Sequence, residues 1–142
     1  MCSSDLGPYA VQQKPGEKMV RKKVLSVGQC GMDHGSIRRL IEGNFAAEVV
    51  GADDEPEALA ALAEGTVDLV LINRRLDADG ADGVALLEKI KQSPAGRNTP
   101  AMLVSNYPEA QQRAVAAGAE PGFGKNELRS TATLEKLRRI LG

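Results

Sequence analysis

The run from Val67 to Ile72 constrains the fold of this chain more than any other segment, because it is apolar throughout except at Asp68. A strand that is apolar on both of its faces must be covered on both, which is typical of a parallel sheet in an α/β protein. We therefore predict that this segment is a central strand, with helices packed on the two sides of the sheet.

Segments typical of strands and of helices alternate along the rest of the chain. The other predicted strands cover residues 24–27, 48–52, 101–104 and, less strongly, 122–124. Apolar residues at helical spacing follow each strand, in the segments 37–41, 58–63, 84–90, 110–117 and 134–141. Asp33 and Ser36 are the candidate caps of the first helix. Right-handed crossovers between these strands give an α/β fold with a doubly wound, five-stranded parallel sheet.

The composition is that of one soluble domain and argues against several classes of function. The chain has 142 residues, 42% of them hydrophobic, which is enough for one core. With a formal net charge of −1, the chain lacks the excess of basic residues that is typical of nucleic-acid-binding domains. No apolar run approaches the roughly 20 residues that span a bilayer. Cys2 and Cys30 form neither a disulfide framework nor a CxxC metal pair.

The first 20 residues differ from the rest in composition. They carry few apolar side chains and several Ser, Gly, Pro, Gln and Lys residues, so they cannot bury much surface. We expect a mobile tail at 1–20 and a single domain at 21–142. The chain does not begin with the basic and apolar pattern of a signal peptide, and we expect a cytoplasmic protein with no nucleic-acid or membrane partner.

Functional residues of a doubly wound sheet are expected just beyond the carboxyl ends of its strands. In this sequence those positions are Gly28-Gln29, Asp53-Asp54, Asn73, Ser105-Asn106 and Lys125. Asp53 and Asp54 follow the second strand, which the fold places two strands away from Asn73, or about 10 Å at normal strand spacing. The candidate site is therefore formed by the residues after the other strands.

Four stretches of the sequence, in this order, resemble the receiver domain of bacterial two-component response regulators. They are the strand that ends in Asn73, Asp82-Gly83 with its following helix, the strand that ends in Ser105, and Gly118-Ala119 with Lys125 six residues later. Each motif is weak alone, but four at nearly the family spacing are specific, and the resemblance runs from Lys23 to the C-terminus. It implies a (βα)5 flavodoxin-like receiver fold with strand order 2-1-3-4-5.

The resemblance fails at the residues that carry the family's phosphorylation chemistry. Gly28 and Gln29 stand where the family has two acidic residues that hold Mg²⁺, and Asn73 stands where it has the phosphoaccepting aspartate. Ser105 and Lys125 match the family's hydroxyl and lysine. A carboxamide is a poor nucleophile, and Mg²⁺ is normally held by carboxylates. We therefore predict a degenerate phosphoacceptor pocket with no metal, no cofactor and no enzymatic activity.

Two more positions depart from the family pattern. The family's lysine pairs with the acceptor carboxylate, whereas Lys125 would face the neutral Asn73, so we expect it to turn to water or to bond to the Asn73 side-chain carbonyl. The family's aromatic switch residue of the fifth strand falls at Gly122, with Phe123 displaced by one place.

These departures favour a phosphorylation-independent protein-interaction module in two-component phosphorelay signalling. The resemblance implies a partner on the face of the fourth helix, fifth strand and fifth helix: a histidine kinase, an effector or a second copy of the chain. Two alternatives stay open. Either Asp77 or Asp82 is a displaced phosphoacceptor, or the glycine-rich first turn around Gly28 and Gly31 binds a small molecule or anion through backbone N–H groups.

Overall fold

The computed structural model describes residues 21–142, and the tail predicted at 1–20 lies outside the described residues. The strands are β1 (Lys22–Val27), β2 (Ala47–Ala52), β3 (Leu69–Asn73), β4 (Ala101–Val104) and β5 (Glu120–Phe123). The helices are α1 (Gly31–Asn44), α2 (Glu55–Ala63), α3 (Gly83–Gln92), α4 (Pro108–Ala116) and α5 (Thr131–Leu141), with a short 3-10 helix η1 (Lys125–Glu127) before α5. Within residues 21–142, every helix is too short or too polar to serve as a membrane span.

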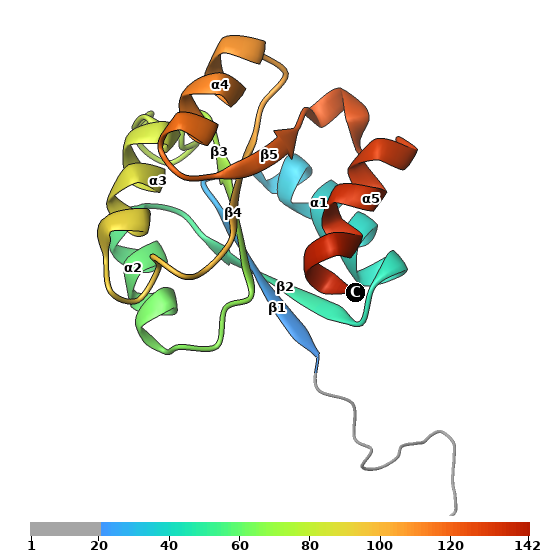
Figure 1. The fold of residues 1–142 in the computed structure, drawn as a ribbon, viewed down its shortest axis with the longest axis horizontal. Helices are drawn as coiled ribbons and strands as arrows, with labels where there is room; N and C mark the ends of the chain where they lie inside the picture. Colours follow the sequence, from blue (N-terminus) through green and yellow to red (C-terminus); the bar gives the residue numbers. More distant parts are fainter. Residues whose placement is uncertain (1–20) are drawn as a thin grey trace, which may run out of the picture.

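The five strands form one parallel sheet in the order β2-β1-β3-β4-β5, which confirms the predicted fold class and strand order (Figure 1). Helices α1 and α5 cover one face of the sheet, and α2, α3 and α4 cover the other (Figure 1). The carboxyl ends of all strands therefore lie along one edge, where the loops to the helices begin.

The central strand β3 is buried on both faces, as the apolar run predicted. Val70 and Ile72 belong to the core under α2, α3 and α4, whereas Leu69 and Leu71 belong to the core under α1 and α5. All four side chains are fully inaccessible to solvent. Burying an aliphatic side chain of this size contributes roughly 1.5–3 kcal/mol, so β3 anchors both layers and fixes the position of the residue that ends it.

The cap of α1 is Cys30, so the prediction of Asp33 or Ser36 is wrong. The Asp33 backbone N–H donates to the Cys30 Sγ at 3.5 Å, and the helix begins one residue after the cysteine. Ser36 lies in the second turn, where a side chain cannot cap the first N–H groups. Because Asp33 is not the cap, its carboxylate is left to face the neighbouring loops.

Candidate functional site

Three of the five predicted pocket residues line one cavity at the carboxyl edge of the sheet. Asn73 ends β3, Ser105 follows β4, and Lys125 begins η1 after β5. They line a cavity of about 290 Å³ together with Arg74, Arg75, Val104, Asn106 and Tyr107. Gly28 and Gln29 do not line it, so this cavity is formed by residues that end or follow β3, β4 and β5, without those after β1.

The Asn73 carboxamide works as a double hydrogen-bond donor. Its Nδ2 donates to the carbonyl oxygen of Gly28 at 3.1 Å and to that of Arg75 at 2.8 Å. The same Gly28 carbonyl also accepts the backbone N–H of Asp77 at 2.9 Å. Both hydrogens of the amide group are used, and a carboxylate has none to donate. Asn73 therefore ties the loop after β1 to the loop after β3.

Leu76 fills the space beside Gly28. Gly28 adopts a left-handed backbone with φ of +74°, and a Cβ atom built on it would overlap the Leu76 Cδ2. Leu76 comes from the loop after β3 and is 1% exposed, because it packs into the core under α2, α3 and α4. While Leu76 occupies this space, no side chain fits at position 28, and this excludes an acidic residue there.

Gln29 supplies no charge to the site. Both its Oε1 and its Nε2 are buried, and neither has a hydrogen-bond partner among the described residues. Within residues 21–142, no three His, Cys, Asp or Glu side chains are grouped so that they could hold a metal ion. The groups at positions 28, 29 and 73 are therefore all neutral.

Lys125 pairs with Asp33, so both predictions for its ammonium group are wrong. Its Nζ lies 2.7 Å from the Asp33 Oδ2. The hydrogen bond from Lys125 lowers the pKa of the Asp33 carboxyl below its ordinary value, against a smaller opposing effect of burial. The sequence signal for this partner is an acidic residue in the first turn of the helix that follows β1. We interpreted that residue only as a candidate cap.

The pairing of Asp33 with Lys125 predicts a small pH-dependent contribution to stability. The contribution is present above the unfolded pKa of aspartate, about 3.9, and is lost as the pH falls through the lowered folded pKa. Because both side chains are about a third exposed, we expect no more than ~1 kcal/mol. Urea unfolding of wild type and Asp33→Asn should show wild type more stable at neutral pH, with the difference disappearing in strong acid. An equal difference at both pH values would contradict the pairing. In a Lys125→Met background the difference at neutral pH should be smaller, because only the interactions of Asp33 with Cys30 and with the first turn of α1 remain.

The acidic loop after β3 folds as a short hairpin, with an antiparallel bridge between Arg75 and Asp82. Asp82 caps α3, since its Oδ1 accepts the Val84 N–H at 3.1 Å, and its Oδ2 lies 3.0 Å from the Arg113 Nη2 of α4. Asp77 is exposed. Neither of these candidate acceptors lines the cavity described above.

Two backbone N–H donors of the glycine-rich first turn already have partners within the protein. The Gly28 N–H donates to the Ala52 carbonyl at 2.8 Å, and the Asp33 N–H is used by the Cys30 cap. The first turn of α1 already carries a carboxylate, that of Asp33, which pairs with Lys125, so an anion would meet an ion pair at this end of the helix.

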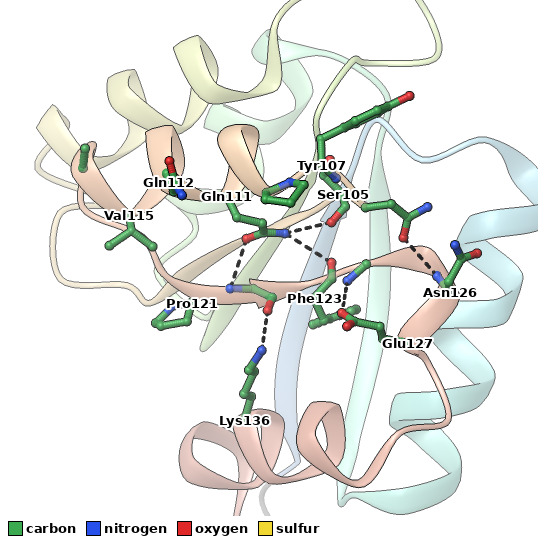
Figure 2. Close-up of a pocket in the computed structure, with 15 residues that line it drawn as sticks. Ser105, Tyr107, Gln111, Gln112, Val115, Pro121, Phe123, Asn126, Glu127 and Lys136 are labelled. Carbon is green, nitrogen blue, oxygen red and sulfur yellow. Dashed lines mark hydrogen bonds between the residues drawn. The ribbon is translucent and has the colours of Figure 1, made fainter.

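A larger groove of about 760 Å³ adjoins the cavity (Figure 2). It lies over β5, with residues of α4 on one side and Lys136 of α5 on the other. Tyr107 and Val115 line it and are 54% and 46% exposed; they are two of the three large exposed hydrophobic side chains within residues 21–142. Ser105, Asn106 and Tyr107 line both the groove and the cavity, so the two spaces are adjacent.

The floor of the groove contains an irregularity in the pairing of β4 with β5. Two residues of β5, Pro121 and Gly122, lie opposite Leu103 alone, between the regular pairs Met102–Glu120 and Val104–Phe123. Proline has no N–H to donate, and a Cβ at Gly122 would overlap the Leu103 carbonyl oxygen. An extra residue of this kind disrupts the ladder locally, so polar backbone groups here need another partner.

Gln111 of α4 is that partner. Its Nε2 donates to the carbonyl oxygens of Leu103 and Ser105 at 3.0 Å each, and its Oε1 accepts the Gly122 N–H at 3.3 Å (Figure 2). The sequence patterns did not point to this residue. The available signal was the Pro-Gly pair in the weakest strand, which indicates an interrupted ladder but not the side chain that repairs it.

Comparisons with known proteins agree with the observed architecture. A response regulator from Thermotoga maritima superposes with a TM-score of 0.70 at 22% identity, covering 86% of this chain and 98% of that one. The signal receiver domain of a DNA binding response regulator from Colwellia psychrerythraea superposes with a TM-score of 0.70 at 24% identity, covering 84% and 97%. A chemotaxis response regulator of Vibrio cholerae gives 0.66 at 21% identity, covering 86% and 100%.

These likenesses concern the fold, and the family itself is shown by the sequence. A search among curated proteins found no significant match. The family model described as the response regulator receiver domain, however, matches residues 33–131, which is more than half of the chain. The protein therefore belongs to the receiver domain family of the response regulators of two-component signalling.

Proposed function

We propose that residues 21–142 form a receiver domain that acts as a phosphorylation-independent protein-interaction module, without enzymatic activity. The observation that carries this proposal is the bonding of Asn73, at the position that matches the family's phosphoacceptor. Its amide donates to the carbonyls of Gly28 and Arg75. A group bonded in this way is a structural link between two loops, whereas a phosphoacceptor needs a free anionic oxygen.

The surroundings of Asn73 support the same proposal. Transfer of a phosphoryl group needs a cation that neutralises its oxygens, and such a cation needs carboxylate or similar oxygen ligands. Leu76 fills the space beside Gly28, and the carbonyl oxygens of Gly28 and Arg75 already accept the amide hydrogens of Asn73. Ser105 is present at its family position, but its Oγ accepts the Tyr107 N–H at 3.1 Å and so serves the turn after β4.

The groove over β5 is the proposed binding face for a protein partner of the same signalling pathway. It combines a concave shape, with a volume of about 760 Å³, and exposed apolar side chains. This combination is typical of interaction sites. Gln111 holds β4, β5 and α4 together at its floor through its carboxamide bonds to both strands. The face is therefore formed without a phosphorylation event.

Treatment with acetyl phosphate and Mg²⁺, followed by intact mass measurement, tests the absence of phosphorylation. Wild type is expected to gain no phosphoryl group. Asn73→Asp is expected to gain none either, because its carboxylate would face two carbonyl oxygens and no ligand set would hold the metal. A receiver domain with the complete acidic set serves as the positive control.

Labelling of Asn73→Asp would contradict this account directly. Labelling of wild type that is lost in Asp77→Asn or Asp82→Asn would replace it with a displaced phosphoacceptor. Asp79→Asn is the matched control for those two variants, because Asp79 lies in the same loop and its Oδ1 caps only the Ala81 N–H at 3.0 Å.

A further inference from the structure

We propose that the partner presents an aspartate or glutamate side chain to Arg74, while its neighbouring apolar side chains occupy the groove over β5. This inference rests on the proposed function and specifies the chemistry of the partner. It concerns the cavity beyond Tyr107, which shares Ser105, Asn106 and Tyr107 with the lining of the groove. The cavity therefore lies beside the groove, where the next residues of a segment bound in the groove would come.

The cavity carries an excess of positive charge. Its lining includes Arg74, Arg75 and Lys125, and no acidic side chain. Lys125 is neutralised by Asp33, and the Arg75 Nη1 is 3.4 Å from the Gly80 carbonyl oxygen. Arg74 is half-buried, and within residues 21–142 its guanidinium has neither a hydrogen bond nor an ion pair. Arg74 is therefore the group that an incoming carboxylate would pair with.

The groove itself holds no comparable charge. Its acidic side chain, Glu127, accepts the Gly124 N–H at 2.8 Å, and its basic side chain, Lys136, donates to the Gly122 carbonyl at 2.8 Å. Both charges are bonded to the backbone, and one offsets the other. The charge pattern of the whole face is therefore a neutral, partly apolar groove that ends in a cationic cavity, and this pattern complements a segment with apolar residues followed by an acidic one.

The geometry of Arg74 favours recognition of a carboxylate. Its Cζ lies 4.6 Å from the centroid of the Tyr107 ring. Stacking on an aromatic ring restrains the guanidinium and leaves the N–H donors at its edge available, and that edge matches a carboxylate in a bidentate pair. Because the side chain is already restrained, less conformational entropy is lost on binding. Tyr107 thus has two contacts in this arrangement, with Arg74 on its ring and with the partner in the groove.

Selection of phage-displayed random peptides on the full-length protein tests this inference. We expect the enriched peptides to carry an aspartate or glutamate next to apolar residues. The best peptide is then synthesised and its affinity measured by isothermal titration. Arg74→Gln should weaken binding about tenfold, as expected for loss of a charged hydrogen-bonded pair. Arg97→Gln is the matched control, since Arg97 is an exposed arginine before β4, at the opposite edge of the sheet.

A double-mutant cycle then shows whether Arg74 and the peptide carboxylate interact. The peptide with its acidic residue changed to the amide should bind wild type and Arg74→Gln equally. If the peptide binds Val115→Asn more weakly than wild type but binds Arg74→Gln as tightly as wild type, this inference is overturned and the interaction face stands. If no enriched peptide depends on Val115 or Tyr107, the proposed interaction face itself is contradicted, and the inference with it.

Discussion

Gln111→Leu is expected to lower the free energy of unfolding by about 2–4 kcal/mol, because leucine cannot replace the amide that repairs the β4–β5 ladder. The variant keeps the apolar volume of the side chain but leaves the Leu103 carbonyl and the Gly122 N–H without their bonds to position 111. Each buried polar group left unpaired costs roughly 1–3 kcal/mol. Urea denaturation followed by circular dichroism measures the loss.

Two further variants show whether hydrogen bonding at position 111 is the cause. Gln112→Leu makes the same substitution at the neighbouring exposed position and should change stability by no more than about 0.5 kcal/mol. Gln111→Glu keeps two acceptor oxygens but loses the N–H donors to Leu103 and Ser105, so it should also be destabilised at neutral pH. If Gln111→Leu were as stable as Gln112→Leu, the carboxamide would not be holding the two strands together.

Gly28→Asp, which places an acidic residue where the family resemblance expects one, is expected to destabilise the fold by about 2–5 kcal/mol and to create no Mg²⁺ site. The φ of +74° is strained for any residue with a Cβ, and the new side chain would overlap Leu76. Urea denaturation gives the change in stability. Thermal unfolding with and without MgCl₂ shows whether the ion binds the folded state.

Gly43→Asp is the matched control for this prediction. Gly43 lies in α1, and a Cβ there would meet no atom within 4 Å, so the same substitution should have only the small effect of an exposed helical position. Stabilisation of Gly28→Asp by MgCl₂ would show that Leu76 moves aside and that a metal site is still accessible. A variant as stable as Gly43→Asp would show that the backbone at position 28 is not constrained.

The contacts around Asn73 are mutually consistent. Glycine at position 28 leaves room for Leu76, asparagine at position 73 bonds to the carbonyl of that glycine, and Lys125 pairs with Asp33 in place of a carboxylate at position 73. The Asn73 amide and the Lys125 ammonium group both have partners within the described residues, whereas the amide of Gln29 has none. Restoring single residues is therefore expected to break present contacts before it restores phosphorylation.

The fold was predictable because local patterns carry it. The apolar run at β3 indicated burial on both faces, and the alternation of strand and helix segments then left the doubly wound sheet as the architecture. The residues at the ends of β3, β4 and β5 followed from the topology, because parallel strands bring their carboxyl ends to one edge. The absence of a carboxylate at position 73 could be read directly from the sequence, because the residue there is asparagine.

Only the tertiary structure decided which groups these side chains contact. Asp33 and Lys125 are separated by most of the chain, Leu76 reaches Gly28 through a loop hairpin, and Gln111 meets Gly122 because β5 carries an extra residue opposite Leu103. None of these contacts has a periodic signal, since each depends on loop conformation and on the register of strands far apart in sequence. The sequence by itself therefore determined which groups lie at the sheet edge and which charges are missing, and packing in three dimensions decided how the remaining groups satisfy one another.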